Sequence, residues 1–114
     1  MTLSQRQRLF VKLLPRLIDF AYAQGYEMTV GDAYRDPRLH GALGVPLGYG
    51  HRNSNHKNRL AQDYNLFKDG VFLQATEDHK PLGEFWKSLH PLCRWGGDFN
   101  DGNHYSIESS EGMR

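Results

Sequence analysis

Apolar residues near the start of the chain recur at intervals of three and four, which is the period of an amphipathic helix. These residues are Phe10, Leu13, Leu14, Leu17, Ile18 and Ala21. We therefore predict a helix over residues 4–24, with Ser4 as its N-cap and Gly25 as its C-terminal stop. Pro15 lies inside this range and has no backbone N–H, so it predicts a kink or a second helix start.

Later stretches have the alternation and the turn residues of β-strands. Residues 26–34 are typical of a strand, and so are residues 104–108, in which apolar and polar side chains alternate. Residues 68–70, Lys-Asp-Gly, have the composition of a tight hairpin turn. This turn would join two strands, Asp63–Phe67 and Val71–Leu73.

A second, shorter helix is predicted from Pro81, which suits a first helical turn, to about His90. Its apolar positions follow the helical period and are Leu82, Phe85, Trp86 and Leu89. The polar residues 76–79 before it are expected to be exposed to solvent. The sequence therefore predicts an α+β fold in one domain over residues 1–114. An N-terminal amphipathic helix and one or two further helices would pack on a small antiparallel sheet.

Composition narrows the functional classes. The chain is 39% hydrophobic and 24% charged with a formal net charge of +1, which argues against a strong electrostatic surface for nucleic acid. No stretch approaches the ~20 apolar residues of a membrane span. Pro15 and Asp19 interrupt any signal-peptide core. Cys93 is the single cysteine, so an internal disulfide is excluded, and we expect a buried thiol.

Two polar, turn-rich segments hold the chemistry: residues 54–63 and residues 95–104. Together they contain two histidines and several carboxylates. Neutral imidazoles and one carboxylate are typical zinc ligands, and a further carboxylate can act on a zinc-bound water. The sequence thus points to a catalytic zinc site.

The spacing of His56 and Asp63 limits how both residues reach one ion. On a helix, seven residues would separate their Cα atoms by about 10.5 Å along the axis. On an unbroken strand, the odd offset would direct them to opposite faces. We therefore expect His56 in a loop that leads into a strand carrying Asp63. Asp101 precedes His104 by a three-residue step through Gly102 and Asn103, so a tight turn would fold that carboxylate toward the same ion.

These motifs, Ser-x-His-x6-Asp over residues 54–63 and Trp-Gly-Gly-Asp with Asp-x-x-His over residues 95–104, resemble those of zinc peptidases. The family includes D-alanyl-D-alanine carboxypeptidases and dipeptidases, with a hedgehog/DD-peptidase-like fold. The chain looks closest to the phage L-alanyl-D-glutamate endopeptidases, or endolysins, which cut bacterial peptidoglycan. The likeness extends over about residues 25–108, including Gly31-Asp32-Ala33-Tyr34-Arg35 and Pro81-Leu82-Gly83-Glu84-Phe85-Trp86. Arg59 stands where many members have glycine, but phage-type members often have arginine there.

The resemblance implies a role for each candidate residue. His56, Asp63 and His104 would bind Zn²⁺, and Asp101 would be the general base. Arg35 would bind a substrate carboxylate or the developing oxyanion. The substrate would be the stem peptide of bacterial peptidoglycan. The enzyme would be a monomer, made in the host cytoplasm without a signal peptide and acting on the cell wall after release.

Several alternatives stay open at this stage. Asp98 is a rival to Asp101 as base, and His51 is a candidate for lining the cleft, whereas His40, His79 and His90 are expected to be surface or hydrogen-bonded residues. The glycine-rich residues 41–50 either border the substrate groove or form a long connection. At the level of function, the alternatives are a D-Ala-D-Ala carboxypeptidase or dipeptidase, and a non-catalytic zinc-binding interaction module.

Overall fold

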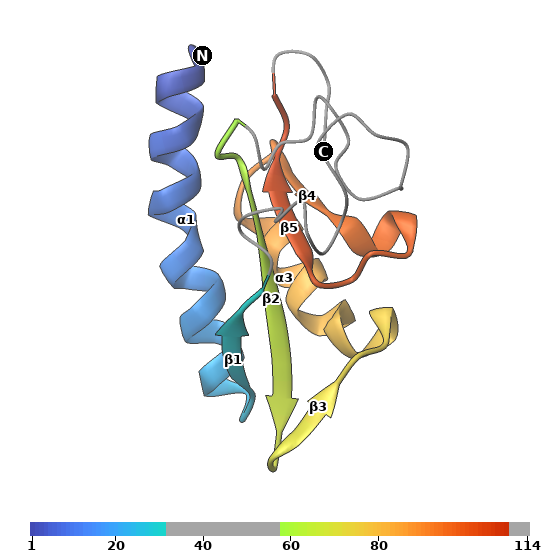
Figure 1. Ribbon diagram of the computed structural model, residues 1–114. Coiled ribbons are helices and arrows are strands. Elements are labelled where there is room, and N and C mark those ends of the chain that lie inside the picture. Colours follow the sequence, from blue (N-terminus) through green and yellow to red (C-terminus); the bar gives the residue numbers. More distant parts are fainter. Residues whose placement is uncertain (32–57, 110–114) are drawn as a thin grey trace, which may run out of the picture.

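A computed structural model describes residues 1–31 and 58–109 of the 114-residue chain. The elements of this part are, in chain order, α1 (Leu3–Ala23), β1 (Glu27–Val30), β2 (Ala61–Lys68), β3 (Val71–Leu73), the 3-10 helix η1 (Thr76–His79), α3 (Lys80–Leu89), β4 (Cys93–Trp95), the 3-10 helix η2 (Gly96–Phe99) and β5 (His104–Ile107). All strand pairs are antiparallel. The predicted α+β class, with two helices on a small antiparallel sheet, is confirmed (Figure 1).

Strand β2 is the centre of the sheet, whose order is β1-β2-β5-β4 with β3 also paired to β2. Phe67 of β2 has a β1 residue as its partner on one side and a β3 residue on the other. Asp63 of β2 likewise accepts a hydrogen bond from Gly31, just after β1, and pairs with β5 on its other side. Hence β5 and β3 follow one another along the same edge of β2, opposite β1.

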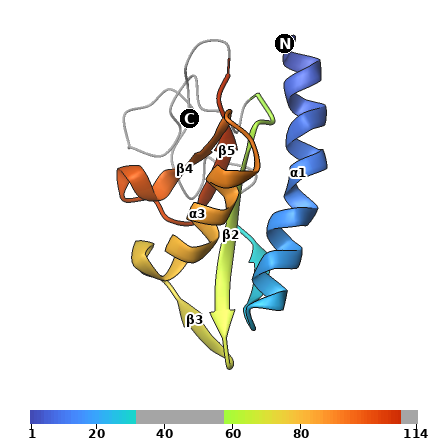
Figure 2. The same ribbon diagram turned by 180° about the vertical axis from the view of Figure 1, so that it is seen from behind.

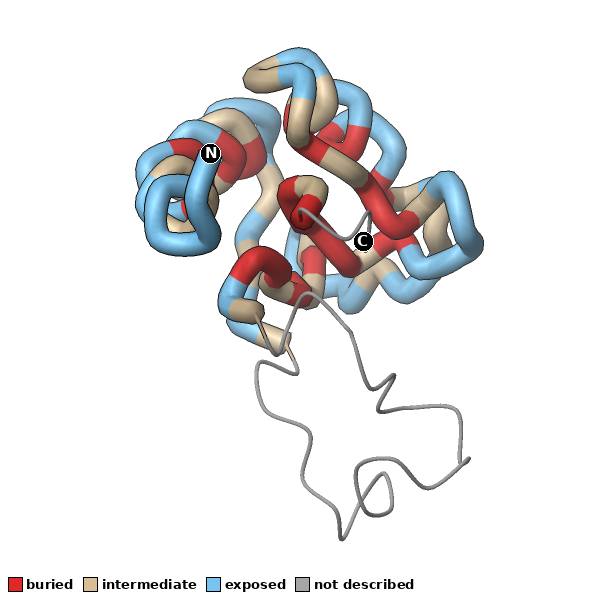
Figure 3. The backbone as a smooth tube through the Cα atoms, turned by 90° about the horizontal axis from the view of Figure 1, so that it is seen from above, coloured by how far each residue is buried: buried red, intermediate tan, exposed pale blue. Residues whose placement is uncertain are grey.

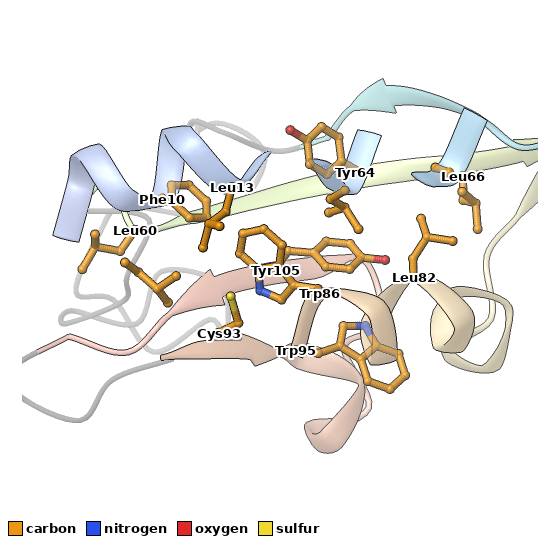
Figure 4. Packing of buried hydrophobic residues seen from close by; sticks show 13 residues of the cluster. Phe10, Leu13, Leu60, Tyr64, Leu66, Leu82, Trp86, Cys93, Trp95 and Tyr105 are labelled. Atoms are coloured by element: carbon orange, nitrogen blue, oxygen red, sulfur yellow. The ribbon is translucent and has the colours of Figure 1, made fainter. Parts of the chain in front are cut away.

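One face of the sheet is covered by α1 and α3, which is clearest from behind (Figure 2). The apolar core between the layers contains Phe10, Leu13, Leu17, Ala21, Leu60, Tyr64, Leu66, Leu82, Trp86, Cys93, Trp95, Tyr105 and Ile107 (Figure 4). Trp86 of α3 lies at its centre, because its ring is edge-on to both Phe10, at 5.9 Å between centroids, and Tyr105, at 6.4 Å. Its indole N–H donates to the carbonyls of Arg94 in β4, at 3.0 Å, and Ser106 in β5, at 2.9 Å. One side chain therefore joins α1, α3 and two strands.

Helix α1 begins earlier than the sequence analysis predicted. Its N-cap is Thr2 and not Ser4, because Thr2 forms a reciprocal capping box with Gln5. Gly25 follows the helix with φ of +89°, so its expected role at the C-terminal end is confirmed. Pro15 lies within one continuous helix, on the exposed side, where the Val11 carbonyl that loses its partner can be hydrated.

The buried positions of α1 face the sheet (Figure 3). No helix among the described residues is long and apolar enough to cross a membrane.

The expected hairpin is confirmed. Asp69 and Gly70 both have positive φ values, +51° and +78°, as the central residues of a type I′ turn require. Strand β2 starts two residues before the predicted Asp63 because Ala61 already pairs with Ser106 of β5. Helix α3 begins as predicted, with Pro81 in its first turn, and it buries Leu82 and Trp86.

Trp86→Phe is expected to lower the free energy of unfolding by about 1–3 kcal/mol, because two buried carbonyls lose their shared donor. Urea denaturation followed by circular dichroism measures this. Val11→Ala, at a position 64% exposed on α1, is the control and should stay within about 0.5 kcal/mol of the original protein. Equal stabilities for the two variants would contradict the central role of the indole N–H.

Burial raises the pKa of the Cys93 thiol to about 12. At pH 8 the thiolate that alkylating reagents require is therefore scarce in the folded protein. We expect iodoacetamide to label Cys93 at least 100-fold more slowly in buffer than in 8 M urea, as measured by mass spectrometry. Comparable rates would show that the thiol is accessible in the native fold.

Candidate metal centre

The hydrogen bonds between β2 and β5 determine which side chains of the two strands come close. Tyr64 N–H donates to Asn103 at 2.9 Å, and Ile107 N–H donates to Leu60 at 3.0 Å. In an antiparallel ladder such hydrogen-bonded pairs alternate with narrow pairs, whose Cα atoms are only about 4.5 Å apart. Asp63 and His104 are register partners in this alternation. They therefore form a narrow pair, and their side chains project from the same face.

The carboxylate of Asp63 and the imidazole of His104 are in contact, with 3.2 Å between Oδ1 and Nδ1. Both residues are buried, with 6% and 5% of their surfaces exposed. Their neighbours in sequence, Tyr64 and Tyr105, belong to the apolar core on the other face. The pair is thus a polar site on the sheet face that turns away from α1 and α3.

The spacing of these two groups fits a shared zinc ion. Ligand atoms at about 2.0–2.1 Å from a tetrahedral zinc are roughly 3.3–3.4 Å apart. The observed 3.2 Å between Asp63 Oδ1 and His104 Nδ1 is close to this value, and it is also an ordinary hydrogen-bond distance. The donor set, one imidazole and one carboxylate, is one that zinc accepts.

Two further expected site residues belong to the part of the chain that the structure does not describe. His56, the third predicted ligand, and Arg35, the predicted anion-binding residue, lie outside the described residues, as do His40, His51 and residues 41–50. Within residues 1–31 and 58–109, no group of three or more histidines, cysteines and carboxylates is arranged to hold a metal. The structure thus brings together two of the three predicted ligands.

The turn before β5, residues 101–103, is held through both backbone polar groups of Gly102. Gly102 N–H donates to Thr76 Oγ1 at 3.2 Å, and the Gly102 carbonyl accepts from the Trp95 indole at 2.7 Å. Asp101 is tied at its backbone, since its N–H donates to Gly96 and its carbonyl accepts from His104 N–H. The turn that was expected from Asp101-Gly102-Asn103 is present, and it places Asp101 three residues before the metal-ligand candidate His104 on β5.

Glycines make this arrangement possible by leaving room for close backbone contacts. A Cβ on Gly96 would lie 2.2 Å from the Asp101 carbonyl oxygen and 2.7 Å from His104 Cβ. A Cβ on Gly97 or on Gly83 of α3 would lie 2.1 Å from the Trp95 ring, so these glycines allow close packing around the indole. The Trp-Gly-Gly motif therefore has a structural function, which is to anchor the turn.

A cavity of about 230 Å³ lies beside the turn, between β3 and β5. We call it the notch, and its lining includes Asn65, Phe72, Gln74, Thr76, Asp101 and Asn103. It is located where the shared edge of β2 passes from β5 to β3. Asp101, the predicted base, is exposed on the wall of this notch.

His79 also lines the notch, and the prediction that residues 76–79 are exposed is wrong for it. Only 2% of its surface is exposed, and its Nδ1 is 2.8 Å from the hydroxyl of Tyr105. Burial lowers the pKa of His79, partly opposed by the charges of Asp78 and Asp101, so the imidazole is neutral at pH 7. Burial also raises the pKa of Tyr105. Neither the spacing nor the composition of the sequence around His79 predicted its buried contact with Tyr105.

The two candidate bases, Asp98 and Asp101, lie in different surroundings. Asp98 lies in η2, where its carboxylate is 3.3 Å from Lys87 Nζ of α3. Asp101 lies on the turn and lines the notch. His90, the other described histidine outside these sites, accepts a hydrogen bond at Nδ1 from Leu92 N–H, as expected for a hydrogen-bonded residue. The two carboxylates therefore differ in their surroundings, since Asp98 pairs with a lysine and Asp101 lines the notch.

Comparisons with known proteins add no relative, because no family model and no curated protein matches the chain.

Gly96→Ala is expected to displace the turn and His104, because the new methyl group would overlap the Asp101 carbonyl. We predict at least a tenfold loss of zinc affinity, measured by competition with a chromogenic chelator. Gly25→Ala is the control, since no atom lies within 4 Å of its Cβ position and only the positive φ is strained. Unchanged zinc affinity in Gly96→Ala would contradict the need for this close approach.

Proposed function

We propose that the protein is a zinc-dependent peptidoglycan hydrolase that cleaves the L-alanyl-D-glutamate bond of cell-wall stem peptides. The observation that carries the proposal is the buried Asp63–His104 pair, whose ligand atoms are 3.2 Å apart on neighbouring strands. Asp101, on the anchored turn three residues before His104, is exposed and lines the notch, and we assign its carboxylate as the general base. The resemblance of both motifs to phage endopeptidases supports the same conclusion and suggests a role in host lysis.

In the proposed mechanism, different residues of the chain bind the metal, transfer the proton and bind the anionic group. His56, Asp63 and His104 would hold the zinc ion, which supplies an activated water and a Lewis acid for the scissile carbonyl. Asp101 takes a proton from the attacking water and returns it to the leaving amine. Arg35 provides a planar, permanently charged fork for a substrate carboxylate or for the oxyanion.

Asp101→Asn tests the base. The amide cannot accept the water proton, so turnover of purified peptidoglycan should fall by about 10²–10⁴-fold while one zinc per chain remains bound. Asp98→Asn is the matched control; it removes the same charge from the Lys87 ion pair and should keep most of the activity. Mass spectrometry of the released fragments, together with metal analysis of each variant, gives both readouts.

The outcomes distinguish the proposal from its alternatives. New L-Ala and D-Glu ends that disappear in Asp101→Asn support the endopeptidase. Release of D-alanine alone would make the protein a carboxypeptidase. No cleavage by a folded, zinc-loaded protein would favour a binding module. Loss of zinc in Asp101→Asn would make this residue a ligand and not the base.

A further inference from the structure

We propose that the notch between β3 and β5 is a substrate subsite for a residue that carries a side-chain ammonium, two residues beyond the cleaved bond on the leaving-group side. This inference rests on the proposed function for its reference point, the bond cut at the Asp63–His104 pair. It adds a binding site for a defined part of the substrate. At about 230 Å³ the notch is smaller than a typical whole-ligand pocket of about 300–1,000 Å³, so it suits one portion of a longer peptide.

The position of the notch sets which part of the substrate it meets. Asn65, one of its lining residues, is two residues beyond Asp63 on the same strand, so both side chains project from the same face. Two residues of a strand advance about 6.8 Å. An extended peptide covers this distance in about two residues. The notch is therefore about two residues away from a bond that is cut at Asp63 and His104.

The side of the cleaved bond follows from Asp101. The same carboxylate lines the notch and, as the proposed base, hands a proton to the leaving amine. The chain that begins with this amine therefore leads into the notch. In a stem peptide cleaved between L-alanine and D-glutamate, the second residue of that chain is a diamino acid, whose side chain ends in an ammonium.

The chemistry of the lining selects a cation over an anion. Among the described residues that form the notch, Asp101 contributes a negative charge, and no lysine or arginine contributes a positive one. His79 adds no positive charge at pH 7, because burial lowers its pKa. The amides of Asn65, Gln74, Asn100 and Asn103 offer carbonyl oxygens as acceptors. A carboxylate would meet the charge of Asp101 at short range, whereas an ammonium is attracted by it.

Phe72 gives the notch an apolar wall for the methylene part of such a side chain. The residue is 47% exposed, and its ring stacks on Phe67 with 5.2 Å between centroids. A long side chain with an ammonium end can place its methylenes on this ring and its charge near the amides. The combination of an aromatic wall and acceptor oxygens fits a diamino acid better than a short or acidic residue.

The test uses two synthetic peptides that differ only in this charge. In L-Ala-γ-D-Glu-X-D-Ala, X is L-lysine in one and L-norleucine in the other. We expect the zinc-loaded protein to cleave the lysine peptide with at least tenfold higher kcat/KM. Gln74→Lys places a positive charge in the lining and should bring the two values within about twofold of one another. Gln24→Lys, the same substitution at the exposed end of α1, should leave the preference intact.

The outcomes separate this inference from the proposed function. Equal kcat/KM for both peptides would overturn the subsite while leaving the endopeptidase in place. If the zinc-loaded protein cleaves neither peptide, the proposed function fails, and binding decides the subsite on its own. In that case γ-D-Glu-L-Lys-D-Ala is titrated into the protein and followed by NMR. Shifts in the side-chain amides of Asn65 and Gln74, absent with the norleucine peptide, would support the subsite; no shifts would overturn it.

Discussion

The candidate site depends on which residue pairs of β2 and β5 are hydrogen-bonded and which are the narrow pairs between them. Asp63 and His104 meet because the hydrogen-bonded pairs on either side of them make theirs a narrow pair. A shift of one residue would exchange the two faces of a strand. Asp63 would then enter the apolar core, and Tyr64 would take its place at the site. The same register that closes the core thus also brings the two proposed ligands together.

The turn before β5 depends on contacts that only glycine allows. Gly83, Gly96 and Gly97 each leave space that a methyl group would fill, and the Trp95 indole occupies much of it. Lys87 lies over this ring at 5.6 Å and also pairs with Asp98. Asp98 is therefore linked to Trp95 through Lys87. The conformational freedom that these glycines lose on folding is offset by a buried hydrogen bond and a large aromatic contact.

The strongly periodic parts of the fold were predictable from sequence. Helix α1, the Asp69–Gly70 turn and the Pro81 start of α3 all follow from local spacing and from residues with restricted backbone angles. The N-cap was misplaced because Thr2 and Ser4 are both good caps, and only the reciprocal bond to Gln5 separates them.

The surroundings of the site were less predictable, because they arise from tertiary contacts. The burial of His79 depends on Tyr105, which is 26 residues later in the chain. The anchoring of Gly102 depends on Thr76, which is equally distant in sequence. The notch exists because β3 and β5 share one edge of β2, and no local pattern specifies that sharing. By contrast, the family resemblance of the two motifs predicted in advance that Asp63 and His104 belong to one site, and their side chains are in contact.

The central position of β2 also has a consequence for the order of folding. Its pairing with β3 closes a two-residue turn, and hairpins of this kind form in microseconds. Its pairing with β5 joins residues 41 apart, so a much larger loop must close before any contact compensates for the lost chain entropy. The hairpin can therefore serve as a preformed template on which the distant strand docks. The hairpin pairs residues 66–68 with residues 71–73, so Asp63 lies outside it and meets His104 only when β5 docks. Metal binding by this pair would therefore report the completion of folding.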